Sequence, residues 1–229
     1  MVIGFSTGSL ALGNFRLGLK MVAGKSTAAV ELSALRDVEL QPLVESLDAL
    51  DLSQFDYISV HAPSRFESVT EMEVLALLEP VFERAWPVVV HPDAIRDFSL
   101  WKLHGGLVCI ENMDKRKPLG RTAAELSTIF ASLPDASLCF DIGHARQIDP
   151  TMREARKILA AHGSRLRQVH LSDVTTTSAH EPLGFTALLG YRQIAHLLPS
   201  DVPVILETPV GESELEDEMR RAERLLVPH

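Results

Sequence analysis

Residues 137–144, SLCFDIGH, combine the features that decide the fold. The apolar run that ends at Phe140 is typical of a buried β-strand. Asp141 closes the run with a polar side chain, and Gly143 permits a tight turn before His144. We therefore interpret this stretch as a strand that delivers polar side chains at its carboxyl end.

The same pattern recurs along the whole chain. Short apolar, β-branched runs alternate with segments of helical periodicity, such as residues 38–50 and 72–82. The predicted strands are residues 2–6, 28–33, 56–61, 87–91, 107–112, 137–141, 167–171 and 202–207. Each repeat has about 29 residues, close to the size of a compact βα unit.

Capping residues mark several predicted helix ends. Thr122 and Glu125 have the spacing of a capping box. Asp149-Pro150 predicts the start of another helix, and Gly163 predicts its end. Residues 214–226 have the pattern of a final amphipathic helix.

Eight strands alternating with helical segments predict an α/β fold, a single (β/α)8 TIM barrel that spans residues 1–229 as one domain. The alternative is a doubly wound open sheet, which would carry a glycine-rich phosphate loop after its first strand. Residues 5–9, FSTGS, lack the G-x-G-x-x-G spacing of that loop. The barrel is therefore favoured.

Most of the predicted strands end in a residue that can bind metal. In a parallel barrel the carboxyl ends of all strands meet on one face, where active sites are built. A lone polar residue there is usually solvated, but several together would be costly without a compensating cation. We therefore expect a shared divalent metal site. The candidates are His61, His91, Glu111, Asp141, His170 and Glu207, with Glu31 as a seventh.

Further candidates lie in the loops beside these strand ends. His144 follows a strand-end acid by three residues, and His180 lies in the loop after the seventh strand. Arg116 and Arg146 could clamp a phosphate or carboxylate near the metal, although a solvated charged loop is the plainer interpretation. The remaining histidines, His104, His162, His196 and His229, are interpreted as non-functional.

The overall composition limits the class of protein. Hydrophobic residues make up 46% and charged residues 23%, which is ordinary for a globular protein. No apolar run reaches the ~20 residues of a membrane helix. Residues 1–13 lack a cationic region and are broken by glycine, so we expect no signal peptide and a cytoplasmic protein. Cys109 and Cys139 precede predicted ligands by two residues and are expected to fill the barrel below them.

The net charge of −9 bears on the partner. A negative field repels polyanions, and the 6% of aromatic residues do not interleave with a basic patch. We therefore expect a small-molecule substrate and neither duplex nucleic acid nor a membrane as partner.

These motifs resemble the xylose isomerase-like TIM-barrel superfamily, which includes sugar phosphate isomerases, epimerases and endonuclease IV. The resemblance runs from Ile3 to Glu207. Its most specific parts are VH at 60–61, EN at 111–112, FDIGH at 140–144, VHLSD at 169–173 and LET at 206–208.

In the isomerase and epimerase branch, the resemblance implies one divalent cation, zinc or manganese. Its ligands would be Glu111, Asp141, His170 and Glu207. Glu111 and Glu207 would exchange a proton beside a metal-polarised carbonyl. His144, Arg116, Arg146 and His180 would contact the substrate, and His144 would assist catalysis. The leading hypothesis is an isomerase or epimerase of carbohydrate metabolism that acts on a small sugar, sugar phosphate or related polyol.

In the endonuclease IV branch, the resemblance implies up to three zinc ions and a phosphoesterase. His61, His91 and Glu111 would form a second site beside the main one. His144 and His180 match a third site, but Ser178 stands where that branch has an aspartate, so a third ion would bind weakly or not at all. A non-catalytic metal-binding barrel is a further alternative. Barrels of this superfamily often pair, so a homo-oligomer is compatible with each hypothesis.

Overall fold

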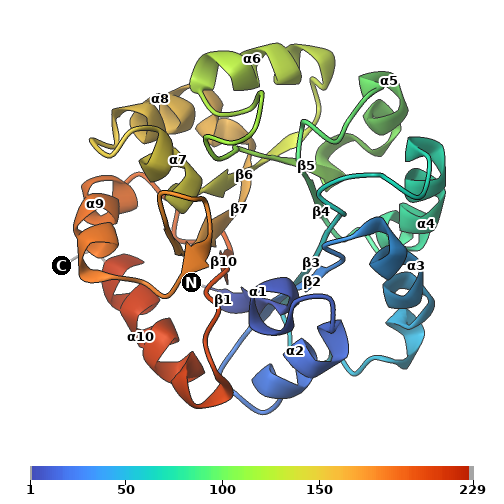
Figure 1. Ribbon diagram of the computed structural model, residues 1–229, viewed down its shortest axis with the longest axis horizontal. Helices are drawn as coiled ribbons and strands as arrows, with labels where there is room; N and C mark the ends of the chain where they lie inside the picture. Colours follow the sequence, from blue (N-terminus) through green and yellow to red (C-terminus); the bar gives the residue numbers. More distant parts are fainter. Residues whose placement is uncertain (1, 227–229) are drawn as a thin grey trace.

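The computed structural model describes residues 2–226 and confirms the closed parallel barrel. Its strands pair in the circular order β1-β10-β7-β6-β5-β4-β3-β2, and helices surround them (Figure 1). The strands are β1 (Ile3–Ser6), β2 (Ala29–Ser33), β3 (Tyr57–His61), β4 (Val88–Val90), β5 (Val108–Glu111), β6 (Ser137–Asp141), β7 (Leu166–Leu171) and β10 (Val204–Leu206). Each overlaps one of the strands predicted from the sequence.

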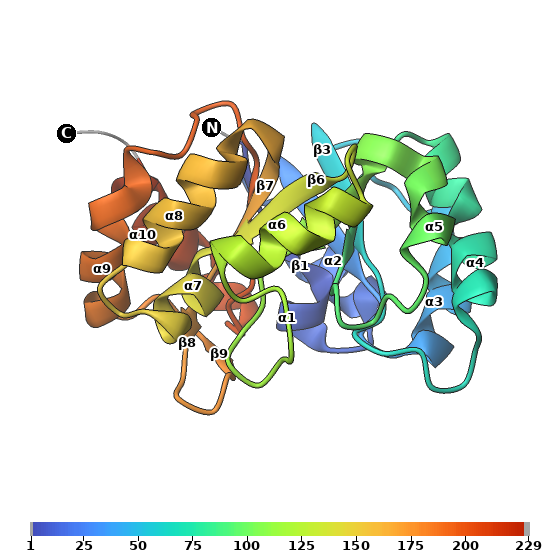
Figure 2. The same ribbon diagram turned by 90° about the horizontal axis from the view of Figure 1, so that it is seen from above.

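The connections between these strands are mainly helical. The helices are α1 (Thr7–Ala11), α2 (Phe15–Val22), α3 (Asp37–Glu45), α4 (Glu71–Glu83), α5 (Phe98–Trp101), α6 (Ala123–Ser132), α7 (Ile142–Ile148), α8 (Arg153–His162), α9 (Phe185–Ala195) and α10 (Leu215–Leu226). Short 3-10 turns lie at Leu47–Ala49, Lys102–Leu107, Gly163–Arg165 and Glu212–Glu214. A small antiparallel hairpin of β8 (Asp173–Val174) and β9 (His180–Glu181) projects from one end of the barrel (Figure 2).

The predicted helix start at Asp149-Pro150 is wrong, because α8 begins only at Arg153. Asp149 ends the preceding helix α7 instead, which the sequence analysis missed. Its carboxylate accepts from the backbone N–H groups of Thr151 and Glu154 and so closes a separate turn. Gly163 does end α8, as predicted.

Other capping predictions hold in part. Thr122 caps α6 by accepting from the backbone N–H of Glu125. The Glu125 carboxylate accepts hydrogen bonds from Arg121, so the second hydrogen bond of the capping box, from the backbone N–H of Thr122, does not form. The helix predicted over 38–50 ends at Glu45 and continues as a 3-10 turn.

The barrel interior is filled by small apolar side chains beneath its polar mouth. Cys109 and Cys139 are fully buried and pack with Val89, as expected for residues that fill the barrel. Burial raises the pKa of the Cys109 thiol to about 12, so this sulfur stays protonated at neutral pH. Within residues 2–226, no helix combines the length and apolarity needed to cross a bilayer.

Candidate metal centre

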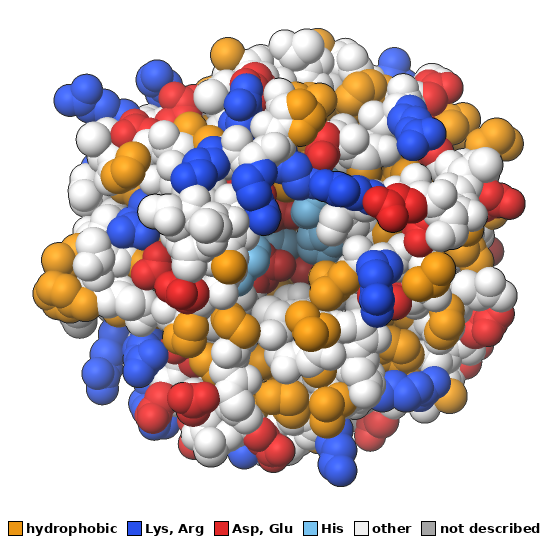
Figure 3. Space-filling view, viewed as in Figure 1, with side chains coloured by type: hydrophobic (Ala, Val, Ile, Leu, Met, Phe, Trp, Pro, Cys, Tyr) orange, Lys and Arg blue, Asp and Glu red, His pale blue; other side chains and the backbone are white. Residues whose placement is uncertain are grey.

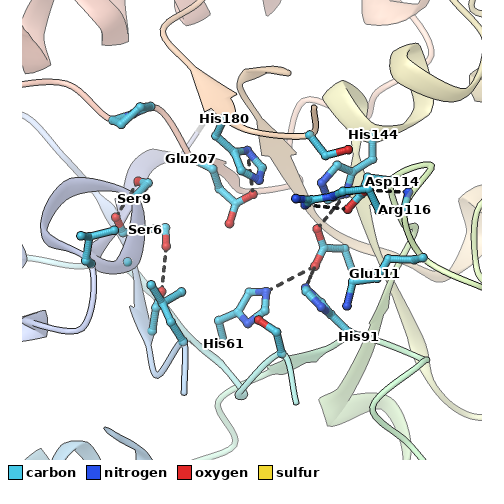
Figure 4. Close-up of a pocket in the computed structure, with 18 of the residues that line it drawn as sticks. Ser6, Ser9, His61, His91, Glu111, Asp114, Arg116, His144, His180 and Glu207 are labelled. Atoms are coloured by element: carbon cyan, nitrogen blue, oxygen red, sulfur yellow. Dashed lines mark hydrogen bonds and ion pairs between the residues drawn. The ribbon is translucent and has the colours of Figure 1, made fainter. Parts of the chain in front are cut away.

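Eight acidic and imidazole side chains meet at the carboxyl end of the barrel and form what we call the acid–histidine cluster. Figure 4 shows those that line the cavity, which are His61, His91, Glu111, His144, His180 and Glu207. Strands deliver most of them at their ends or at the next residue, helix α7 adds one imidazole from its first turn, and the β8–β9 hairpin adds another. The members are His61, His91, Glu111, Asp141, His144, His170, His180 and Glu207.

The local backbone of α7 explains how two members of the cluster share one mouth. Asp141 ends β6 and is also the N-cap of α7, where its Oδ1 accepts from the backbone N–H of His144 at 2.6 Å. Gly143 allows this close turn, because a Cβ there would lie 2.5 Å from the Val174 side chain. The strand-to-helix junction therefore points Asp141 and His144 at the same space.

Glu111 lies at the centre of the cluster. Its Oε2 is 3.3 Å from His61 Nε2 and 3.1 Å from His91 Nε2. Its Oε1 is 3.3 Å from His144 Nδ1 and 3.4 Å from His170 Nδ1. The two oxygens of one carboxylate therefore face two different pairs of imidazoles, which is the arrangement of a bridging ligand.

The ligand atoms group into overlapping sets whose members all lie within 4.8 Å of one another. One set joins His61, His91 and Glu111, and a second joins Glu111, Asp141, His170 and Glu207. A third set holds Asp141, His144 and His180. A fourth set, which the sequence analysis did not propose, holds Glu31, His61 and Glu207.

Ser178 lies at the cavity wall but its hydroxyl is used elsewhere. It exchanges hydrogen bonds with the side-chain amide of Gln147 at 2.8 and 3.1 Å. In the third set the carboxylate comes from Asp141, which the second set also uses. A third cation would therefore have to share Asp141 with a cation in the second set.

Unsatisfied polar atoms test whether the cluster fits a cation. Asp141 Oδ2 and His170 Nδ1 are buried and make no hydrogen bond within the described residues. His170 Nδ1 lies only 3.3 Å from Glu207 Oε2, yet without hydrogen-bond geometry. Buried groups of this kind are costly unless something pairs with them. Carboxylate oxygens and imidazole nitrogens at these separations suit a divalent transition metal such as zinc or manganese.

The pKa shifts within the cluster also fit a site for a cation. Burial alone raises the pKa of Glu111, but the imidazoles of His144, His170, His61 and His91 around its carboxylate outweigh burial and hold this pKa well below the usual range. Burial raises the pKa of Asp141 to about 6, against the attraction of His144. Burial likewise opposes the charged form of His61, yet Glu111 and other carboxylates raise the pKa of His61 to about 9. Protons on the imidazoles thus balance the carboxylates in the metal-free protein.

Zinc binding should therefore release protons at about pH 8. The pKa values of about 9 for His61 and about 10 for His144 lie above this pH, so both imidazoles hold an extra proton before metal arrives. Ligation requires the neutral ring. Calorimetric zinc titrations in buffers of different ionisation enthalpy should show a buffer-dependent heat. An identical heat in all buffers would contradict this account.

A cavity of about 510 Å³ opens above the cluster. Figure 3 shows the hollow, with histidines at its floor and Lys and Arg side chains along one side. Arg65, Arg116 and Lys117 belong to its lining, and serine hydroxyls of Ser6, Ser9, Ser33 and Ser64 belong to it as well. The cavity therefore offers cationic and hydroxyl contacts next to the candidate ligands.

The basic residues of the mouth differ in what they contact. Asp114, a buried acid that the sequence analysis did not single out, holds the Arg116 guanidinium at 3.0 and 3.2 Å. Lys117 pairs with Asp93 at 2.9 Å. Arg146 pairs with Asp173 at 3.0 Å and is absent from the cavity lining, so the structure does not bring it to the substrate space.

The other histidines lie away from the cluster. His162 is buried beside α6, where its Nε2 lies 3.2 Å from Ser127 Oγ and 3.1 Å from the Ala123 carbonyl. His104 stacks on Phe82 with ring centroids 3.8 Å apart. His196 follows α9 at its C-cap, and His229 lies outside the described residues.

Comparisons with known proteins identify other chains with this architecture. The chain matches no protein-family profile, and no curated protein matches it by sequence. Solved structures do match it over nearly the full length. Endonuclease IV from Thermus thermophilus is 20% identical, with 99% of each chain covered and a TM-score of 0.63.

Two further structures broaden the comparison. A xylose isomerase domain-containing protein from Salmonella typhimurium is 17% identical, with 99% of this chain and 97% of that chain covered and a TM-score of 0.62. A probable 3-DHS dehydratase from Bacillus anthracis, involved in petrobactin synthesis, is 11% identical, with 97% and 99% covered and a TM-score of 0.67. This chain therefore has the (β/α)8 fold that is shared by endonuclease IV and the xylose isomerase-like domain proteins.

Proposed function

We propose that the protein is a hydrolase that cleaves a phosphate ester of a small substrate at a pair of divalent cations. The observation that carries this proposal is the position of Glu111, whose Oε2 faces His61 and His91 while its Oε1 faces His144 and His170. A single-cation isomerase does not need His61 and His91 as ligands. Endonuclease IV, a hydrolase of nucleic acid phosphodiesters by its name, has the same fold.

The chain's own residues have distinct parts in this reaction. Cations bound by the cluster would supply Lewis acidity that activates a water and stabilises the leaving oxygen. Hydrolysis forms a bond between the water oxygen and phosphorus and breaks the bond between phosphorus and the ester oxygen. Glu207, whose side chain lines the cavity and is 12% exposed, would take the water proton.

The proton needed by the leaving group can come from an imidazole that lies beside Glu207 at the mouth. His180 is the most exposed imidazole of the cluster's ion pairs, at 31%, and its Nδ1 lies 2.7 Å from Ser172 Oγ and 3.7 Å from Glu207 Oε2. This contact with Ser172 orients the ring at the mouth. We assign His180 the role of proton donor to the ester oxygen.

The substrate class follows from the size and charge of the cavity. A volume of about 510 Å³ is within the range of small-molecule sites. Arg116 and Lys117 line the cavity and suit an anionic substrate, while the overall charge of −9 disfavours a long polyanion. Serine hydroxyls in the lining suit a hydroxylated substrate, so a sugar phosphate or a similar small ester fits best.

The isomerase hypothesis stays the second candidate, and one observation favours it. Glu111, Asp141, His170 and Glu207 converge within 4.8 Å of one another without any help from His61 or His91. One cation held there would polarise a carbonyl between two carboxylates that can exchange a proton. The test is a parallel screen of small phosphate esters, an abasic-site duplex and ketoses. Metal-dependent release of phosphate supports the hydrolase, whereas epimerisation with deuterium uptake and no hydrolysis would contradict it.

Replacing Arg116 by alanine should weaken binding of an anionic substrate. A charge-assisted hydrogen bond contributes about 1.5–3 kcal/mol, so KM should rise roughly 10- to 100-fold while kcat changes little. Arg121→Ala is the matched control, because Arg121 pairs with Glu125 and is absent from the cavity lining. Steady-state kinetics on the best ester of the screen measures both variants. Equal KM values for the two would exclude Arg116 from substrate binding.

A further inference from the structure

Glu31 is a fully buried acid in the barrel lumen that the proposed reaction does not use. It comes from β2, whereas the candidate ligand His170 comes from β7, and two other strands separate these in the barrel order. Glu31 Oε2 nevertheless lies 3.1 Å from His170 Nε2. The Glu31 side chain therefore crosses the lumen to contact a member of the acid–histidine cluster.

The hydrogen bonds around Glu31 form a connected network inside the barrel. Oε2 accepts from Gln168 Nε2 at 2.7 Å and from Ser59 Oγ at 3.1 Å. Tyr57 donates its hydroxyl to Gln168 Oε1 at 2.6 Å, which fixes the orientation of that amide. The amide NH₂ group must therefore point toward Glu31 and His170, and 2.9 Å separates Gln168 Nε2 from His170 Nε2.

The Gln168 amide and the Glu31 carboxylate both lie within hydrogen-bond distance of His170 Nε2. The amide requires this nitrogen to accept a hydrogen bond, whereas the carboxylate requires it to donate one. If the Gln168 amide donated to Nε2, the ring proton would have to lie on Nδ1, and the lone pair would face away from the centre. A carboxylate beside Nε2 favours the other tautomer, because it accepts the Nε2 proton. Nδ1 then turns a lone pair toward Glu111 Oε1 and Glu207 Oε2, which lie 3.4 and 3.3 Å away.

We propose that Glu31 is a positioning residue for the metal centre: it accepts the His170 Nε2–H and thereby presents His170 Nδ1 as a ligand. The buried, unpartnered His170 Nδ1 is the atom that this tautomer leaves free for a cation. Carboxylate partners behind a ligating imidazole fix its tautomer and raise its basicity in metal sites generally. The inference rests on the cation sites of the proposed function and adds no step to the reaction.

A rival role for Glu31 is direct ligation. Its Oε1 is also buried and unpartnered, and Glu31 groups with His61 and Glu207 within 4.8 Å. However, Oε2 already accepts from Ser59 and Gln168 and lies 3.1 Å from His170 Nε2, which ties the carboxylate to the lumen. The two roles differ in what the loss of the carboxylate does: a positioning residue changes affinity, whereas a ligand changes the number of ions bound.

The test is zinc binding by Glu31→Gln, which keeps the side-chain volume. Zinc titration against a chromophoric chelator should show a roughly 10- to 100-fold weaker affinity with an unchanged number of ions per chain. Ser59→Ala is the matched control, because it removes another hydrogen bond to Glu31 Oε2 without touching His170, and its zinc affinity should equal that of the parent. Thermal unfolding of the metal-free variant adds a second readout. Glu31→Gln replaces a buried carboxylate that accepts from Gln168 and Ser59, so the metal-free Tm is expected to fall in this variant, and to fall less in Ser59→Ala, which loses one of these bonds.

Each outcome decides the inference. Zinc affinity that is weaker in Glu31→Gln than in Ser59→Ala, with an unchanged number of ions per chain, supports it. Parent-like affinity in Glu31→Gln, or a Tm loss with no change in affinity, overturns it and leaves Glu31 a purely structural residue. Loss of one bound ion overturns it in favour of direct ligation. If the parent protein itself binds no zinc, the proposed function fails first, and the two failures are thus distinguishable.

Discussion

Glu111→Gln is expected to abolish tight metal binding and to lower turnover by about a thousandfold or more. The two oxygens of the Glu111 carboxylate face both candidate sites, so an amide there weakens both at once. Lewis-acid stabilisation is worth several kcal/mol, and each ~1.4 kcal/mol is tenfold in rate. Elemental analysis and turnover on the best ester measure the two effects.

The matched control for this variant is Glu181→Gln. Glu181 is an exposed glutamate on the β8–β9 hairpin, beside the mouth but outside the cluster. Its metal content and turnover should equal those of the parent. Glu111→Gln keeps the side-chain volume but removes a carboxylate that four imidazoles surround, so circular dichroism must first show that the variant is folded. Full metal content in folded Glu111→Gln would contradict the bridging role.

The double variant His61→Ala/His91→Ala is expected to lose one cation and most of the hydrolase activity. These imidazoles contact only the Oε2 side of Glu111, so the set of Glu111, Asp141, His170 and Glu207 stays complete. Two cations stabilise both the attacking and the leaving oxygen, and one cannot do so equally well. We expect turnover to fall by roughly 100-fold or more, which is about 2.7 kcal/mol in the barrier.

This variant also separates the two candidate functions. A single-cation isomerase would keep its metal and its activity without His61 and His91. His196→Ala is the control, since His196 lies at the end of α9 and outside the cluster. Unchanged activity with one fewer ion would rule out a two-cation reaction. Unchanged metal content would show that the first set holds no ion.

The barrel and the strand-end residues could be predicted from the sequence for a simple physical reason. A parallel barrel places every strand's carboxyl end on one face, so the register of each strand fixes where its last side chain lies. Asp141 shows this well: it ends β6 where the apolar run ends, and its neighbour His144 follows on the first turn of α7.

Features that depend on contacts between distant segments could not be predicted in this way. Helix α8 starts at Arg153 and not at the predicted Asp149-Pro150, because the Asp149 carboxylate closes a local turn instead of capping a helix. Arg146 points to Asp173 on the hairpin, a partner that no local pattern reveals. The contact of Glu31 with His170 joins residues 139 positions apart across the lumen. Glu31 could be noted at a strand end, but its partner could not.

The most direct test of the account is the number of metal ions per chain, measured by elemental analysis of protein purified without added metal. The bridging geometry of Glu111 predicts two equivalents of zinc or a similar divalent cation. One equivalent, retained in the His61→Ala/His91→Ala variant, would contradict the two-cation hydrolase and return the isomerase hypothesis to first place.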